Sequence, residues 1–295
     1  MKKSTGRIVF EIFNYSFLIF FSLLIILPFM HIVSVSLSSK EAITKLSVTI
    51  WPKGWEFFAY GAILKDRIFI RSFFNTVVLT LIITILNLII DVMSAYAFSK
   101  EFYGKKVFNY YFIITMYFSG GLIPFYLLMT NYLHLYDSFL ALIFPALVNV
   151  FYIIVIRTQI QAIPQSIIEA AIIDGANEGQ TLARIVIPSI VPTLAAIGMF
   201  IALGAWNSWF GVMIFINDNT KWTLQYYLRK ILVDKLLTAS LSDAGQKLLE
   251  MGVTEVMPEN YQMAAIILVA MPIVCIYPFV QKYFVKGILV GSVKE

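Results

Sequence analysis

Residues 169–188 read EAAIIDGANEGQTLARIVIP, and this polar stretch interrupts a chain that is otherwise strongly apolar. Hydrophobic residues make up 60% of the 295 residues and charged residues only 13%, with a mean hydropathy of +0.83. A soluble domain carries about 25% charged residues. Lipid is therefore the expected solvent for much of this chain, and the polar stretch is expected to lie outside the lipid.

Two short helices joined by an elbow are predicted here. Pro164 suits the first turn of a helix, because its missing N–H would be unpaired there. Residues 165–174 then read as a helix that stops at Gly175, where a left-handed residue is favoured. Asn177 can cap a second helix, with Gln180 as its reciprocal partner. The second helix is expected to end where Pro188 opens the next apolar segment.

The first of these helices carries features of a contact surface. Ala170 and Ala171 are small enough to let another surface approach closely, and Glu169 beside them offers a charge-assisted bond to a basic partner. The alternative is a surface loop that binds nothing. Because a plain connection does not need two capped helices, we interpret the stretch as a docking element.

Charge and cysteine content exclude several other classes. The net charge is +5, but the Lys and Arg residues are scattered, singly or in pairs, between apolar blocks. This distribution is typical of residues that flank membrane spans, so no nucleic-acid partner is predicted. Cys275 is the single cysteine, and His31 and His134 are far apart in sequence. No disulfide, metal site or bound cofactor is therefore predicted.

Six apolar segments are long enough to cross a bilayer as helices. They predict an all-α, polytopic membrane protein with an N-terminal segment at residues 1–11 and a tail at 287–295. The expected spans are approximately residues 12–35, 73–98, 107–129, 138–156, 188–216 and 263–285, with residues 157–187 as the polar connection. Ser34-Val35-Ser36 resembles a signal-peptide cleavage site, but the apolar region before it is too long for a signal peptide.

Six spans place both termini on one side of the membrane, but charge does not say which side. The basic residues divide equally between the two sides, and only their density near the span ends favours an inner N-terminus. The polar segments 36–71 and 217–262 would then lie outside. Orientation needs another argument.

Polar and helix-breaking residues occur within the expected spans. Asn87 and Asp91 lie one turn apart and share a helix face. Asp91 could be a pathway residue, but a structural acid bonded to a neighbouring helix is the favoured interpretation. The third span contains Gly120, Gly121 and Pro124, which predict a kink that either lines a pathway or allows close helix packing.

The polar stretch resembles the EAA loop of permease subunits of ATP-binding-cassette (ABC) importers. The matching residues are Glu169-Ala170-Ala171, Gly175 and Ile185-Val186-Ile187-Pro188, with Ile187 in place of the family's usual leucine. Further matches extend the resemblance to the carbohydrate-importing branch and the second maltose-type permease: Tyr96-Ala97-Phe98 with Gly104, Trp206-Asn207, and Tyr283-Phe284-Val285-Lys286-Gly287 with Gly291 to Lys294. Ser119-Gly120-Gly121-Leu122-Ile123-Pro124 and Leu224-Gln225 to Arg229-Lys230-Ile231 resemble a narrower group for oligosaccharides and polysaccharides, including alginate.

This resemblance implies a type I ABC importer fold and a cytoplasmic coupling loop that docks on an ATPase dimer. The implied coupling residues are Glu169, Ala170, Ala171, Asp174, Gly175, Ile185 and Pro188. The resemblance also implies a second permease subunit in a heterodimer, an extracytoplasmic sugar-binding protein, and a bacterial cytoplasmic membrane with both termini inside. The tail 287–295 would reach the ATPase or end in disorder.

The chain is expected to be a transport subunit and not an enzyme. It lacks the GxxxxGK[ST] phosphate loop, so ATP and magnesium would bind to the partner ATPase. Sugar sites favour aromatic rings for stacking and amides or acids for the sugar hydroxyls, which makes the candidate pathway residues Asn149, Tyr152, Trp206, Asn207 and Trp209. Two alternatives are an ABC permease for a peptide, an amino acid or a metal, and an ion-coupled secondary carrier.

Overall fold

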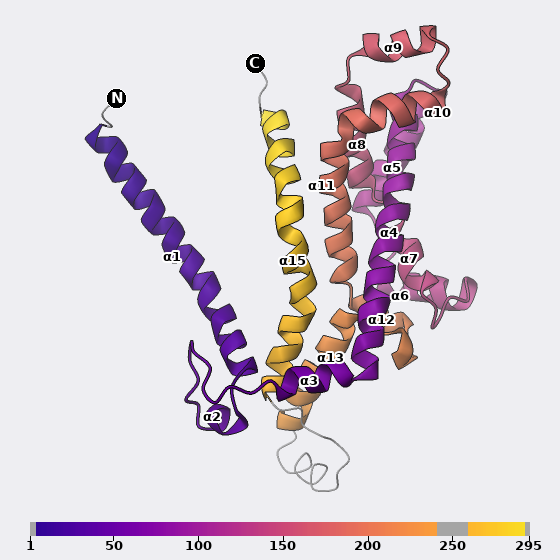
Figure 1. Cartoon of the computed structure of the whole chain (residues 1–295). Helices are drawn as coiled ribbons and strands as arrows, with labels where there is room; N and C mark the ends of the chain where they lie inside the picture. Colours follow the sequence, from indigo (N-terminus) through magenta and orange to yellow (C-terminus); the bar gives the residue numbers. More distant parts are fainter. Residues whose placement is uncertain (1–3, 241–258, 293–295) are drawn as a thin grey trace. The chain divides into compact units, whose positions relative to one another are not determined.

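The computed structural model describes residues 4–240 and 259–292, and every regular element in these two ranges is a helix (Figure 1). The chain divides into two compact units. One contains Met1–Phe69 and Leu228–Met271, and the other contains Ile70–Tyr227 and Pro272–Glu295.

The first unit begins with a long helix whose surface is apolar almost all round. Helix α1 covers Thr5–Ser36, and the Ser4 side chain caps it by accepting the Arg7 N–H. Most α1 side chains are exposed, as expected where lipid or another membrane helix covers the surface. The short helices α2 (Lys40–Thr44) and α3 (Phe58–Lys65) follow.

Serine hydroxyls attach the segment after α1 to the end of that helix. Ser36 Oγ lies 2.8 Å from the Tyr60 hydroxyl, and Ser38 Oγ accepts the Lys53 N–H. Ser34, within the stretch that resembles a cleavage site, is buried and donates to the Ile50 carbonyl. In the structure this stretch is therefore the packed end of a helix.

The second unit contains the helices that position the polar stretch. They are the main part of α4 (Arg67–Ser99), α5 (Lys105–Tyr117), α6 (Leu122–Leu127) with a π turn at Leu128–Tyr132, α7 (Leu140–Ile143) with a 3-10 turn at Phe144–Ala146, α8 (Val150–Gln161), α9 (Gln165–Ile173), α10 (Glu178–Thr181) with a π turn at Leu182–Val186, α11 (Ile187–Trp206) and α12 (Phe210–Phe215). A 3-10 turn (Asn219–Lys221) leads to α13 (Leu224–Ser240), and α15 covers Glu259–Ser292.

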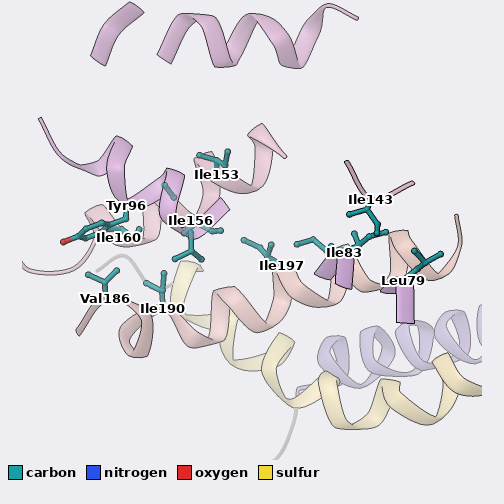
Figure 2. Close-up of a cluster of buried hydrophobic side chains, with 13 residues drawn as sticks. Leu79, Ile83, Tyr96, Ile143, Ile153, Ile156, Ile160, Val186, Ile190 and Ile197 are labelled. Atoms are coloured by element: carbon teal, nitrogen blue, oxygen red, sulfur yellow. The ribbon is translucent and has the colours of Figure 1, made fainter. Parts of the chain in front are cut away.

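A cluster of buried aliphatic side chains holds these helices together, and Figure 2 shows it at close range. It joins α4, α7, α8 and α11, and α8 also packs against α5. Gly198 of α11 allows a close approach to α4, because a Cβ there would lie only 3.0 Å from Leu88 Cδ1. Such contacts through small residues are typical of helices packed in membranes.

Within residues 4–240 and 259–292, four helical segments are long and apolar enough to cross a membrane, and up to six if each of two bent helix pairs is one span. The four are Gly6–Ser36, Arg67–Ser99, Glu178–Trp206 and Glu259–Pro278. The third and fourth expected spans are the two bent pairs. Part of the expected loop 217–262 and the last three residues of the expected tail lie outside the described residues; the tail up to Ser292 belongs to α15.

The third expected span is broken more sharply than a kink. Helices α5 and α6 meet at 108° across the break at residues 118–121. Gly121 has φ +87°, which favours glycine, and Pro124 lies in the first turn of α6. The fourth expected span bends by 42° between α7 and α8.

Helix α11 begins at Ile187 with Pro188 in its first turn, within one residue of the expected start, but no loop separates it from α10. One helical run extends from Glu178 to Trp206, so the second short helix continues into α11. The π turn explains this continuity, because the Ile187 N–H reaches back to the Leu182 carbonyl and Pro188 needs no N–H partner at its position. The run ends at Trp206, and α12 begins only at Phe210, so the expected span 188–216 is also interrupted.

Candidate coupling segment and translocation cavity

Helix α9 lies beyond the ends of α4, α5, α8 and α11 and runs across them (Figure 1). It ends in an elbow formed by two backbone hydrogen bonds. The Ala176 N–H donates to the Ala171 carbonyl at 2.9 Å, and the Gly175 N–H donates to the Ile172 carbonyl at 3.0 Å. Gly175 has φ +82°, so the predicted left-handed position is confirmed.

The elbow is followed at once by the predicted capping box. The Asn177 side chain accepts the Gln180 N–H at 2.9 Å, and the Gln180 side chain accepts the Asn177 N–H at 3.0 Å. These bonds satisfy two N–H groups that the start of α10 would otherwise leave unpaired. The direction of the chain between α9 and α10 is therefore fixed by local sequence.

One side of α9 is apolar and exposed. Ile168 is the buried residue of this helix, whereas Ile172 and Ile173 are 52% and 85% exposed. Glu169 and Ala170 are exposed beside them, and Ala171 is half-buried. Among the described residues no ion pair to Glu169 is found. An exposed acid among exposed isoleucines marks an interaction surface.

The other predicted coupling residues lie on both sides of the elbow. Asp174 is the exposed C-cap of α9. Ile185 is half-buried in the π turn, next to the fully buried Val186, and Pro188 is exposed. The apolar face of this turn packs on the core cluster through Leu182 and Val186.

Asn87 and Asp91 of α4 hold the break between α7 and α8. Asn87 Nδ2 donates to the Ala146 carbonyl at 2.6 Å, and Asp91 Oδ1 accepts the Asn149 N–H at 3.1 Å. The Asn149 side chain in turn accepts the Tyr152 N–H and caps α8. Freed backbone groups at a break within a membrane need such partners. Asp91 is therefore a structural acid bonded to a neighbouring helix.

A cavity of about 250 Å³ lies beside this break. Its polar side chains belong to α4, to α8 and its N-cap residue, to the connection between α11 and α12, and to the residue before α13. The lining residues are Leu79, Ile83, Asn87, Leu142, Pro145, Ala146, Val148, Asn149, Tyr152, Phe200, Ile201, Gly204, Ala205, Ser208, Val212 and Thr223. None of these described residues carries a formal charge.

The structure brings two of the five candidate pathway residues together. Asn149 and Tyr152 line the cavity, whereas Trp206, Asn207 and Trp209 do not. Trp206 is buried and meets the Phe73 ring edge to face. Asn207 caps α11 and accepts from Gln225 Nε2, and Trp209 packs against the Phe210 ring.

The sequence interpretation missed other lining residues. Ser208 lies between the candidates Asn207 and Trp209, but a serine alone does not distinguish a pathway residue from any other polar residue. The spacing of Asn87 and Asp91 predicts only a shared helix face, and Thr223 lies in the expected loop 217–262. A polar residue within a span was the available signal for Asn87.

Comparison with known proteins identifies the class. Residues 93–290 match the family described as binding-protein-dependent transport system inner membrane component, and the chain belongs to this family. It is 34% identical to the polygalacturonan/rhamnogalacturonan transport system permease protein YtcP of Bacillus subtilis (strain 168), over 97% of this chain and 98% of YtcP. It is 35% identical to the protein LplC of the same organism, over 98% of this chain and 96% of LplC.

Two solved structures share the fold. One is a bacterial ABC transporter involved in the import of the acidic polysaccharide alginate, with TM-score 0.85 and 35% identity over 96% of this chain and 99% of the other. The second, an alginate ABC transporter in complex with its pentasaccharide-bound periplasmic protein, has TM-score 0.55 at 19% identity over 95% of this chain and 96% of the other, and it supports the fold alone. The predicted family and fold class are confirmed, and the chain is a non-enzymatic membrane subunit of an ABC importer.

The structural role of Asp91 can be tested by measuring the stability of variants at this position. Asp91→Leu is expected to lower the free energy of unfolding by about 1–3 kcal/mol, because it removes the buried carboxylate that accepts the Asn149 N–H at the break. Asp91→Asn keeps an acceptor oxygen and is expected to cost less. Thermal unfolding of the detergent-solubilised protein measures both. Wild-type stability in Asp91→Leu would contradict the structural role.

Proposed function

We propose that this chain is one of two permease subunits of an ATP-driven importer of an oligosaccharide or polysaccharide. The observation that carries the proposal is the likeness to the alginate importer, at 35% identity and TM-score 0.85 over nearly the whole of both chains. YtcP, whose name states transport of polygalacturonan and rhamnogalacturonan, supports the same substrate class.

In this proposal α9 is the cytoplasmic helix that docks on a separate ATPase. Glu169 would pair with a basic residue of the ATPase, and the exposed isoleucines would fill an apolar cleft around that pair. Ala170 and Ala171 allow close approach, while Asp174 and Gly175 shape the elbow. ATP and magnesium would bind on the ATPase dimer. The inner membrane orientation with both termini inside follows from placing α9 in the cytoplasm.

The cavity beside the α7–α8 break would form part of the sugar pathway. Its amide and hydroxyl groups, from Asn87, Asn149, Ser208 and Thr223, suit sugar hydroxyls, and Tyr152 offers an aromatic ring. An uncharged lining would let a sugar pass without holding it tightly. The second permease would complete the pathway, and an extracytoplasmic binding protein would deliver the sugar.

Uptake by reconstituted vesicles tests this proposal. The chain is combined with its second permease, ATPase and binding protein, and uptake of oligogalacturonate, oligoalginate and a peptide of similar mass is measured. ATP-dependent uptake of an oligosaccharide is expected, with none of the peptide. Uptake of peptide alone would contradict the substrate class, and uptake driven by an ion gradient without the ATPase would contradict the mechanism.

A further inference from the structure

Three side chains join the end of α4 to the start of α10. Glu178, the first residue of α10, accepts a hydrogen bond from the Tyr96 hydroxyl. Lys100 Nζ lies 3.1 Å from Glu178 Oε2 and 3.3 Å from Oε1. The same ammonium group lies 4.9 Å from the centroid of the Tyr96 ring. We call these three residues the α4–α10 brace.

The brace is anchored on the α4 side. Tyr96 is only 8% exposed and belongs to the core cluster, in which Figure 2 shows it. Its hydroxyl group is the part that reaches Glu178. Ser99 Oγ donates to the Tyr96 carbonyl at 2.6 Å and stabilises the last turn of α4. The hydroxyl is thus a fixed donor, and the carboxylate of α10 is held against it by a charge-assisted bond.

We propose that the α4–α10 brace transmits movement of the coupling helix α9 to α4, with Tyr96, Lys100 and Glu178 as positioning residues. The inference rests on the proposed role of α9. With Ile168 as its buried residue, α9 has little attachment of its own to the core. Only residues 174–177 separate α9 from α10, and the elbow and the capping box fix their conformation, so a displacement of α9 is carried into α10.

From α10 the displacement has two routes into the membrane helices. One is the covalent continuation into α11 through the π turn. The other is the brace, which joins segments 82 residues apart in sequence. Leu182 and Val186 of the π turn also pack in the core cluster with α4, but such apolar contacts resist sliding less than a directed hydrogen bond does.

Helix α4 connects the brace to the cavity. Asn87 and Asp91 hold the break between α7 and α8, and Asn87 lines the cavity. Asn87 lies nine residues before Tyr96, which is about 14 Å along an α-helix. A rigid helix transfers a shift at one end to the other, and coupling is carried by contiguous elements of this kind. The brace therefore links the ATPase-docking surface to the cavity wall.

The brace can be removed without unfolding the chain. The Glu178 side chain is 67% exposed and that of Lys100 is 35% exposed, and ion pairs this exposed contribute little to stability. A matched control lies at the same end of α4. Lys105 and Glu101 form a 2.8 Å ion pair within one segment, and the Glu101 side chain is 91% exposed.

The test measures sugar transported per ATP hydrolysed by the assembled transporter in vesicles. Glu178→Gln and Tyr96→Phe are expected to lower this ratio about three- to thirtyfold, since residues that carry coupling change it by such factors. Lys100→Glu alone lowers it as well, and the double variant with Glu178→Lys recovers part of the loss because the opposite charges face each other again. Glu101→Gln leaves the ratio unchanged.

Each other result overturns the proposal. An unchanged ratio in Glu178→Gln and Tyr96→Phe means that the brace transmits nothing. An equal loss in Glu101→Gln, or no recovery in the charge-exchanged double variant, means that general charge or stability is responsible. A different experiment shows whether the proposed docking role of α9 fails. In that case the ATPase co-purifies normally with the Glu169→Lys variant, whatever the transport ratio of the brace variants is.

Discussion

Glu169→Lys is expected to release the ATPase and abolish ATP-driven transport, while the chain still folds and inserts. The side chain stands on the exposed face of α9, and no ion pair to it occurs in the described part of the chain, so its reversal breaks nothing in the fold. Breaking a desolvated charge pair in an interface costs about 2–5 kcal/mol. The expected loss of ATPase affinity is therefore roughly 30-fold or more.

Co-purification with the ATPase and vesicle uptake measure this effect, and the elution profile of the solubilised chain reports folding. Glu101→Lys, an equal charge reversal on an exposed side chain, is the control and is expected to keep the ATPase bound. Gly175→Trp is a second variant, which alters the elbow at the end of α9. Its φ of +82° strains any L side chain, although a Cβ there meets nothing within 4 Å. Normal co-purification and transport with Glu169→Lys would reject the docking role of α9.

Local signals in the sequence were sufficient for the elbow. The left-handed position of Gly175 and the reciprocal bonds of Asn177 and Gln180 involve residues at most three apart, so propensity and spacing determine them. The same local rules placed the start of α11 within one residue, at Pro188, but did not predict that the helix continues from α10 without a loop. A proline permits a helix start but does not require one, and the π turn before it kept the helix continuous.

Contacts between segments that are far apart in the chain could not be predicted from the sequence. The break before α8 is stabilised by Asn87 and Asp91, about 58 residues away in the chain. The brace at Glu178 joins residues 82 apart. Trp206 illustrates the same limit, because an aromatic residue suits either sugar stacking or packing, and its contact with Phe73 places it in the packing between helices.

Gly204→Trp is expected to block transport while the ATPase remains bound. Gly204 lines the cavity, and a Cβ at this position would meet nothing within 4 Å, so a side chain here enters open space and not the core. The indole would occupy much of the cavity of about 250 Å³ that we propose as part of the sugar pathway. A sugar that passes the indole would have to force its atoms into a cavity that is already filled, which costs about 1–3 kcal/mol. This cost corresponds to a roughly 5- to 150-fold loss of transport.

A substitution at Gly204 tests the cavity without changing α9. Gly204 lies 17 residues after the start of α11, about 25 Å along the helix, so the docking surface on α9 is not disturbed. Gly204→Ala is the matched control, because it fills almost no space and stabilises a helix by about 0.5–1 kcal/mol. Vesicle uptake and ATPase co-purification are measured for both variants. Wild-type uptake with Gly204→Trp would place the sugar pathway elsewhere, since a filled cavity cannot conduct.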